Sequence, residues 1–311
     1  MMEVVRTCNF CEHWRTGIPC GICMHPKGHM MGTNDEMVFH NAGKYCPLNN
    51  QEYRDAKLQD IKGLISDMRR SCEKNGVRGA VIGISGGKDS TIVAKLMVEC
   101  LGKENVMGVL MPNGEQNDIE DSYKVVELLD IPYMVVNIKD AMKGLVERVD
   151  YGFKSIHNYP NNTGKDIELT MPSYINIAPR IRMTVLYSIA QSMGNGWRVV
   201  GTTNKSEEYI GWLTKWGDGA ADFEPIIDFT VTELHKLGEY LGLPKELVCK
   251  TPVDGLAEGS DEERIGFTYA MLDKYIVEGS SGDDCIDSKI EHMNEYSEHK
   301  RRLVPRFRLK I

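Results

Sequence analysis

The chain has 311 residues, a formal net charge of −8 and 41% hydrophobic residues, a balance typical of a globular protein with one large domain or two ordinary ones. The acidic charge disfavours broad binding to nucleic acid backbones, and no apolar run approaches the roughly 20 residues that a membrane span needs. Because residues 1–6 lack the apolar core of a signal peptide, we expect a cytoplasmic protein.

The first 50 residues are rich in cysteine, histidine and glycine and show no sustained helical or strand period. This segment contains Cys8, Cys11, Cys20, Cys23 and Cys46. Paired thiolates at such spacing suit a tetrahedrally coordinated metal ion, most simply Zn²⁺. A segment this short needs a stabilising cross-link such as a bound metal ion in order to fold. We favour Cys8, Cys11, Cys23 and Cys46 as ligands, with Cys20 in place of Cys23, an iron–sulfur cluster and unliganded thiols as alternatives. The sequence thus predicts a Cys-rich metal-binding extension over residues 1–50 and a second domain over 51–311.

From residue 51 onward, a first helical period gives way to alternating strands and helices. The hydrophobic pattern predicts strands over 77–84, 106–111, 133–138 and 198–201, and helices over 89–101, 117–129, 139–149 and 175–193. This alternation predicts an α/β fold, a doubly wound parallel sheet flanked by helices, with ligands at the carboxyl ends of the strands. Beyond residue 222 the pattern is mostly helical, over about 230–241, 261–277 and 284–299.

A loop of small residues follows the first predicted strand: Gly83-Ile84-Ser85-Gly86-Gly87-Lys88-Asp89-Ser90. Between a buried strand and a helix N-terminus, its backbone N–H groups would bind an anion, and Ser85 and Ser90 would add hydroxyl donors. Asp89 would repel a phosphate unless a cation lay between them, which favours a magnesium nucleotide as ligand. The loop is not a Walker A motif, because Asp89 stands where that motif requires Ser or Thr. A plain glycine-rich turn is the alternative.

Further segments follow this loop along the chain: Asn176-x3-Arg180-x-Arg182-Met183, Gly201-Thr202-x4-Glu207, Thr214-Lys215-Trp216-Gly217-Asp218-Gly219-Ala220-Ala221-Asp222, and His299-Lys300. The loop resembles the SGGxDS loop of ATP pyrophosphatases, and residues 55–307 together resemble NAD synthetase. The resemblance implies an adenine nucleotide alpha hydrolase-like fold and a homodimer. It implies a ligase that amidates nicotinic acid adenine dinucleotide (deamido-NAD) to NAD with ammonia through an acyl-adenylate, releasing AMP and pyrophosphate. A head of about 50 residues is too short for the amidase domain of glutamine-dependent members.

The same resemblance implies roles for individual residues. Asp89 and Glu207 would be catalytic and would hold Mg²⁺, for which both supply oxygen ligands. Deamido-NAD would be bound by Arg180, Lys215, Asp222, His299 and Lys300. ATP would be bound by Gly83, Ser85, Gly86, Gly87, Lys88, Asp89, Ser90 and Thr202.

The chain also departs from the family pattern. Val231 stands where the family often has a lysine that contacts ATP, and Lys236 is a candidate substitute. Val253 stands where the family commonly has Ser or Thr, and Pro179 replaces a usual Ala at a helix start, which it would bend. These departures leave open how the chain binds ATP.

Two other functions stay open at this point. A tRNA-modifying (thiolating) ATP pyrophosphatase shares the SGGxDS loop, and the cysteine pairs would suit it, but the acidic charge argues against a nucleic acid partner. A non-catalytic nucleotide-binding protein would bind ATP without releasing pyrophosphate. Val231 and Val253 are its best support.

Overall fold

The computed structural model describes residues 30–31, 38–39, 54–55, 58–115, 119–156, 167–248 and 260–307. Cys8, Cys11, Cys20, Cys23 and Cys46, on which the predicted metal site depends, lie outside these residues, and so does Val253. The described part of the first 50 residues consists of β1 (Met30–Met31) and β2 (Val38–Phe39), which pair antiparallel.

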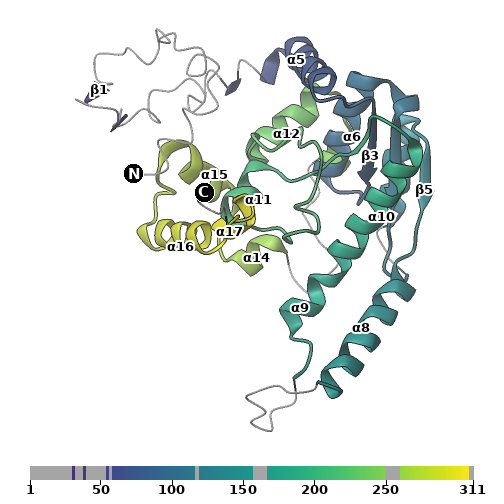
Figure 1. Ribbon diagram of the computed structural model, residues 1–311. Coiled ribbons are helices and arrows are strands. Elements are labelled where there is room, and N and C mark those ends of the chain that lie inside the picture. Colours follow the sequence, from purple (N-terminus) through teal and green to yellow (C-terminus); the bar gives the residue numbers. More distant parts are fainter. Residues whose placement is uncertain are drawn as a thin grey trace, which may run out of the picture.

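The described residues after β2 fold around a parallel four-stranded sheet (Figure 1). Its strands, in the order β5-β4-β3-β6, are β3 (Gly79–Gly83), β4 (Val106–Leu110), β5 (Tyr133–Val135) and β6 (Trp197–Val199). The chain progresses from β3 outward to β5 and then returns to the other side of β3. Because the order reverses there, the loops that follow β3 and β6 meet at the carboxyl edge of the sheet, which is where such sheets bind ligands.

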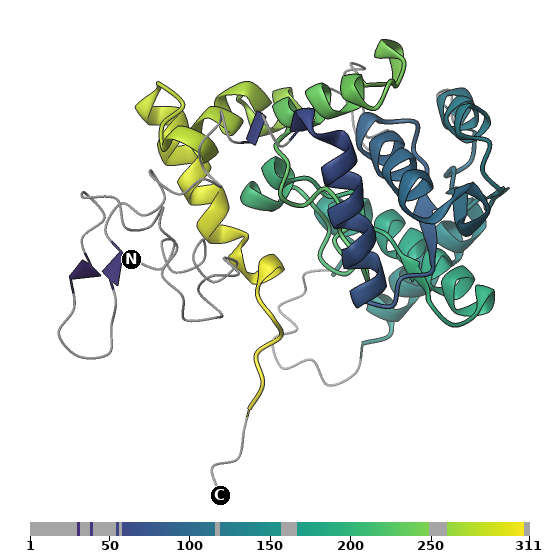
Figure 2. The ribbon, with the colours of Figure 1, turned by 90° about the horizontal axis from the view of Figure 1, so that it is seen from above.

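Helices cover both faces of the sheet, as the alternating pattern predicts (Figures 1 and 2). Strand β3 contributes Ala80 and Ile82 to one buried apolar cluster and Val81 to the other, because successive side chains of a strand point to opposite faces. The helices of this half are α5 (Ile61–Lys74), α6 (Lys88–Leu101), α7 (Ile119–Leu129), α8 (Lys139–Lys154), α9 (Met171–Ile175) and α10 (Ile177–Met193), with a short 3-10 helix η2 (Lys103–Asn105).

The C-terminal part of the chain adds a layer of short helices beside the sheet (Figure 1). They are α11 (Lys205–Ile210), α12 (Val231–Tyr240), α13 (Lys245–Val248), α14 (Asp261–Ile265), α15 (Tyr269–Glu278), α16 (Asp284–Tyr296) and α17 (Glu298–Arg301). Several of them share a third buried cluster that includes Ile210, Val231, Ile265 and Leu272. We call α11 to α17 the helical layer.

Three of the predicted helices are broken in the structure. The helix predicted over 261–277 is wrong as one element, because Gly266 (φ 81°) ends α14 and the side chain of Thr268 caps α15. The helix predicted over 284–299 breaks at Ser297, and the one over 175–193 breaks at Asn176. Pro179 lies in the first turn of α10, where a missing N–H removes no helical hydrogen bond.

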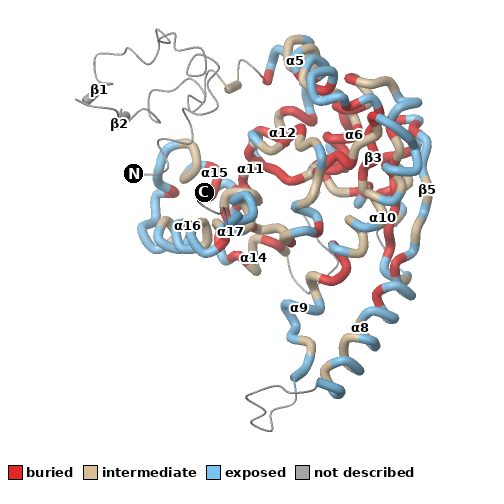
Figure 3. Tube along the Cα trace, in the orientation of Figure 1, coloured by how far each residue is buried: buried red, intermediate tan, exposed pale blue. Residues whose placement is uncertain are grey.

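Burial follows this architecture. Strands β3 and β4 and the inner sides of α6, α11 and α12 are buried, whereas β5, α8, α9 and α16 are largely exposed (Figure 3). Within the described ranges, none of the helices has the length and apolar character needed to cross a membrane.

Candidate active site

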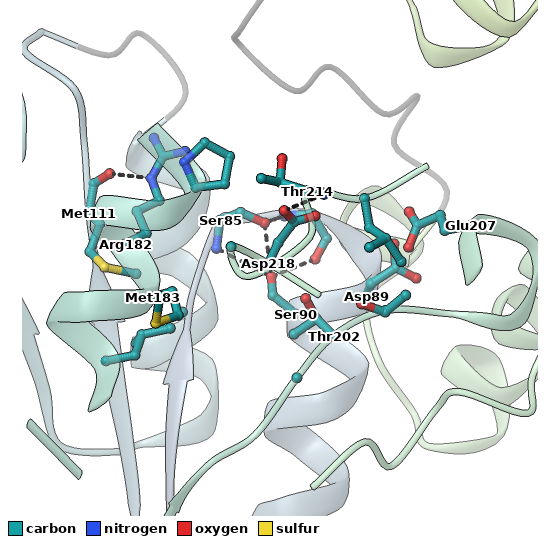
Figure 4. A pocket seen from close by; sticks show the side chains of 18 of the residues that line it. Ser85, Asp89, Ser90, Met111, Arg182, Met183, Thr202, Glu207, Thr214 and Asp218 are labelled. Carbon is teal, nitrogen blue, oxygen red and sulfur yellow. Dashed lines mark hydrogen bonds between the residues drawn. The ribbon is translucent and has the colours of Figure 1, made fainter. Parts of the chain in front are cut away.

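A cavity of about 620 Å³ lies between the carboxyl edge of the sheet and the helical layer. Loops after β3, β4 and β6 line one side, and residues of α10, α14 and α17 line the other sides. In Figure 4, Arg182, Met111 and Met183 lie at one end of this cavity, and Asp89 and Glu207 lie at the other. The residues predicted from the sequence that line it are Gly83, Ser85, Gly87, Lys88, Asp89, Ser90, Thr202, Glu207 and Lys300.

The loop after β3 is held in shape by its own hydroxyl groups. The Ser85 amide donates to Ser90 Oγ at 3.3 Å, and Ser90 Oγ donates to the Gly87 carbonyl at 3.1 Å. Gly86 adopts a φ of 76°, and a Cβ there would lie 2.8 Å from the Asp121 Cβ, so only glycine fits. Helix α6 begins at Lys88 without a side-chain cap, which leaves its first backbone N–H groups facing the cavity as donors for an anion.

Two carboxylates from distant parts of the chain meet around Asn204. Asn204 Nδ2 donates to Asp89 Oδ1 at 3.4 Å, while the Asn204 amide donates to Glu207 Oε2 at 3.2 Å and the Glu207 amide donates to Asn204 Oδ1 at 3.0 Å. The last two bonds form a capping box that starts α11. Asn204 thus fixes Glu207 at a helix start and ties it to Asp89 on α6.

These carboxylates surround a buried lysine. Lys88 is 4% exposed, and its Nζ lies 2.8 Å from Asp89 Oδ2. Burial opposes the charge of Lys88, but the charges of Asp89 and Glu207 outweigh it and raise the pKa of the ammonium. Burial, and then the charge of Asp89, raise the pKa of Glu207 well above its ordinary value. A site that crowds two carboxylates in this way is one where a further cation would be stabilised.

The turn after β6 packs against the carboxyl group of Glu224, a residue that is partly buried. A Cβ on Gly201 would lie 2.1 Å from Glu224 Oε1, so the carboxyl group packs against the backbone of this turn. Burial raises the pKa of Glu224 to about 8, opposed by a hydrogen bond from the Thr203 backbone. Glu224 Oε2 is buried and has no hydrogen-bond partner within the described part of the chain.

The residues predicted to bind deamido-NAD lie mostly outside the cavity. Lys300 lines it and donates to the carbonyls of Gly211 and Leu213, both at 2.7 Å. Arg180, which is exposed, donates to the Lys215 carbonyl at 3.3 Å, and Lys215 Nζ donates to the His299 carbonyl.

Arg180, Lys215 and His299 therefore form one connected group beside the cavity, although none of them lines it. We call this group the rim cluster.

Asp222 holds the end of β6 instead of facing the cavity. Its Oδ2 accepts from the Val199 amide at 3.0 Å, and its Oδ1 accepts from the Tyr187 hydroxyl at 3.3 Å. Burial, and then the charge of Asp222, raise the pKa of Tyr187 to about 12. Gly86 does not line the cavity either; its backbone shapes the loop that does.

Sequence reasoning did not single out several residues that the structure brings to the cavity. Arg182 Nε donates to the Met111 carbonyl at 3.1 Å, and burial lowers the pKa of this guanidinium. Asp218 accepts from the Thr214 amide at 2.9 Å, and burial raises its pKa. Both residues belong to motifs quoted from the sequence, so membership of those motifs is the signal that could have identified them. Arg264, on α14, belongs to none of them.

The structure also places Val231, which stands where the family often has a lysine, and Lys236, the candidate substitute for that lysine. Val231 is buried in the cluster of the helical layer, and its amide donates to Ser206 Oγ at 3.1 Å. Lys236 Nζ donates to Asp55 Oδ1 at 2.8 Å, and Lys236 does not line the cavity. The structure therefore does not bring Lys236 to the site as a substitute.

Comparisons with known proteins agree on one family. A family model described as NAD synthase matches residues 60–304. The NH(3)-dependent NAD(+) synthetase of Pyrococcus horikoshii is 36% identical over 261 residues, which cover 79% of this chain and 95% of that protein. A solved structure of NMN synthetase from Francisella tularensis has a TM-score of 0.69 at 29% identity, covering 82% of this chain and 98% of its own. The NH3-dependent NAD synthetase of Campylobacter jejuni has a TM-score of 0.60 at 25% identity, with coverages of 81% and 98%.

Proposed function

The chain belongs to the NAD synthase family, and from that membership we propose that it is an ammonia-dependent ligase that converts deamido-NAD to NAD with ATP. A carboxylate does not react with ammonia, because oxide is a very poor leaving group. ATP converts the nicotinate carboxylate into an acyl-adenylate with release of pyrophosphate, and ammonia then displaces AMP to form the amide. The observation that carries this proposal is that Asp89 and Glu207 meet at the N-terminus of α6, inside one cavity.

The loop after β3 is suited to hold the triphosphate. Its glycine backbone and the uncapped start of α6 supply donors, and Lys88 adds a positive charge. The hydroxyls of Ser85 and Ser90 would exchange their bonds within the loop for bonds to phosphate oxygens. Thr202 follows β6, the strand that pairs with β3, so it lines the cavity at the same edge of the sheet as this loop and would contact ATP there. These groups neutralise charge on the phosphates while the nicotinate carboxylate attacks the α-phosphorus.

The residues present fit Mg²⁺. Asp89 and Glu207 supply only oxygen atoms, which Mg²⁺ prefers. Burial, and then the charge of Asp89, raise the pKa of Glu207, and a cation between the two carboxylates would relieve their repulsion. When bound with ATP, Mg²⁺ supplies charge neutralisation on the phosphates. Asp89 and Glu207 would hold it, and Asn204 keeps both side chains in place.

The rim cluster and Lys300 would bind deamido-NAD. Arg180, Lys215 and Lys300 bring positive charge to one side of the cavity, where the phosphates of a dinucleotide would lie, and His299 would add a polar contact. Asp222, which is bound to the end of β6, would contribute to the binding of deamido-NAD from there.

A homodimer would complete the binding site for deamido-NAD. Exposed apolar side chains of β5, α8 and α9, at 44% to 68% exposure, would be covered by a second copy: Tyr133, Val135, Leu145, Tyr151, Met171 and Tyr174.

Two further features of the proposal come from the sequence. Residues 1–50 would form a separate extension that binds Zn²⁺ through its cysteines, and residues 51–311 would form the catalytic domain, an adenine nucleotide alpha hydrolase-like doubly wound fold. The enzyme would act in the cytoplasm on small molecules, without a nucleic acid partner.

The experiment is an assay with ATP, Mg²⁺, ammonium and deamido-NAD that measures NAD, AMP and pyrophosphate. Parallel reactions would contain the corresponding acid mononucleotide, because one similar structure is an NMN synthetase, or tRNA with a sulfur donor. Formation of NAD with equal amounts of AMP and pyrophosphate supports the proposal. ATP binding without pyrophosphate release, or turnover only with another substrate, would refute it.

A further inference from the structure

Arg264 places a positive charge at the carboxylate end of the cavity, on the side of the helical layer. It lines the cavity from α14, and its side chain is 24% exposed. The guanidinium carbon lies 4.9 Å from the centre of the Trp212 ring, and Nη1 lies 3.8 Å from Asp261 Oδ1. The guanidinium thus lies over the ring of Trp212, which also lines the cavity.

The charged groups near Arg264 show at which end of the cavity it lies. Asp261, which Arg264 approaches, is close enough to Lys88 to raise the pKa of that ammonium. Lys88 Nζ in turn lies 6.0 Å from the centre of the Tyr269 ring, and burial followed by the charges of Glu207, Asp261 and Asp89 raises the pKa of Tyr269. Arg264 therefore belongs to the end of the cavity where the carboxylates and the N-terminus of α6 gather.

The other cations that line the cavity have different surroundings. Among the described residues, these are Lys88, Arg182 and Lys300. Lys88 pairs with Asp89, Arg182 donates to the Met111 carbonyl at the opposite end, and Lys300 donates to two carbonyls of the wall. Arg264 and Lys300 are the cations that the helical layer presents to the cavity, and Arg264 is the one on α14, beside Asp261.

We propose that Arg264 binds the β- and γ-phosphates of ATP, and so the pyrophosphate that departs. This inference rests on the proposed function. As an oxygen of the nicotinate carboxylate bonds to the α-phosphorus, the bond from that phosphorus to the bridging oxygen breaks, and its electron pair passes to pyrophosphate. A guanidinium that stays protonated and offers parallel N–H donors stabilises this growing charge and transfers no proton.

The absence of a lysine at position 231 agrees with this role. Val231 and Ile265, the residue after Arg264, pack in the same buried cluster of the helical layer. The side chain at position 231 is thus committed to the apolar core, and α14, which packs in the same cluster, brings Arg264 to the cavity.

The test compares Arg264→Met and Arg264→Lys with the full-length wild-type chain. Arg70→Ala, which removes an exposed arginine of α5 paired with Asp67 and distant from the cavity lining, is the control. We expect Arg264→Met to raise the KM for ATP and the inhibition constant of inorganic pyrophosphate by roughly 10- to 100-fold, the effect of a lost charge-assisted hydrogen bond. The KM for deamido-NAD should stay within about twofold, and Arg264→Lys should fall between because a point charge lacks the fork of donors.

Direct binding of magnesium pyrophosphate, measured by calorimetry on each folded variant below its melting temperature, separates this proposal from the catalytic one. If the wild-type chain makes no NAD but binds pyrophosphate, and Arg264→Met binds it at least tenfold more weakly, the role of Arg264 stands while the proposed reaction fails. Equal pyrophosphate binding by Arg264→Met and wild type, or no binding by wild type, would overturn the role of Arg264.

Discussion

The two walls of the cavity are built in different ways. The sheet side is a continuous local structure, in which one strand, one loop and one helix start place Gly83 to Ser90. The helical layer is assembled from separate segments, and its groups are held by long-range contacts such as Lys300 to the Gly211 carbonyl. The sheet side presents backbone donors together with Lys88 and Asp89, and the helical layer presents Glu207, Arg264 and Lys300. The site thus combines a wall fixed locally with a wall fixed by tertiary packing.

The largest effect is expected where the two walls meet. Asp89→Asn should lower pyrophosphate formation by about 10³-fold or more, because it removes a charged ligand from the proposed magnesium site while keeping the side-chain shape. Glu207→Gln, from the other wall, should have a similar effect. The measurement is pyrophosphate release, with circular dichroism and a melting curve to check folding. Turnover like that of wild type in a folded Asp89→Asn variant would contradict the role.

Glu224 gives a test of pH dependence in the turn after β6. Its pKa is about 8 in the folded chain against an ordinary 4.5, so between these values the folded state retains a proton that the unfolded state has lost. This contribution to stability is complete below about pH 4.5, declines as pH rises towards 8, and is gone above that. The gap corresponds to an upper limit of roughly 5 kcal/mol at about 1.4 kcal/mol per pH unit.

Glu224→Gln removes this titration. The free energy of unfolding of the variant, relative to wild type, should therefore increase by several kcal/mol between pH 5 and pH 8. Denaturant unfolding at the two pH values measures it. Asp218 and Glu208 are the charged groups that act on Glu224, and neither is changed by the substitution. A difference that is the same at both pH values would mean that Glu224 is ionised in the folded chain.

Gly86→Ala tests the wall that is fixed locally. Its φ of 76° and the 2.8 Å approach to the Asp121 Cβ mean that a methyl group would strain the loop by about 1–3 kcal/mol. ATP affinity should fall by roughly 10- to 100-fold, as measured by calorimetry.

Gly144→Ala is the matched control for this substitution, because a Cβ on this exposed glycine of α8 would have no neighbour within 4 Å. It should stabilise the chain by about 0.5–1 kcal/mol and leave ATP affinity unchanged. Equal ATP affinity of both variants would show that the shape of the loop does not depend on Gly86.

The smallest effect is expected at the start of α14. Ser260 Oγ accepts from the Glu263 amide at 3.3 Å, and Glu263 Oε2 accepts from the Ser260 amide at 2.7 Å. Ser260→Ala should weaken this capping box by about 0.5–2 kcal/mol and, by fraying α14, raise the inhibition constant of pyrophosphate by a few fold. Ser192→Ala, on the exposed side of α10, should change neither. An unchanged inhibition constant in Ser260→Ala would show that α14 holds Arg264 without its cap.

The sequence predicts the sheet and its loop well for a physical reason. Strand β3, its loop and α6 are contiguous, and their apolar period and small residues are local signals. The parallel sheet with helices on both faces is therefore confirmed. Glu207 was found only through its motif, because nothing local distinguishes it from a solvated helix residue.

The helical layer is less predictable for the opposite reason. The break between α14 and α15 depends on Gly266 and Thr268, whose signals are masked by an apolar period that continues across them. The place of Arg264 at the cavity depends on packing of α14 against segments far away in the sequence. The rim cluster was predicted by resemblance to bind substrate, and in this single chain it lies beside the cavity.

Lys300 reaches back to a carbonyl 89 positions earlier in the chain, and Arg301 donates to the Glu208 carbonyl at 3.0 Å. During translation, the sheet and the loop after β3 can form long before these two residues leave the ribosome. A nascent chain stopped at residue 296 would thus contain the folded loop after β3 but would lack the contacts that Lys300 and Arg301 make with the helical layer. The wall formed by the helical layer should therefore be completed only once α17 has been synthesised.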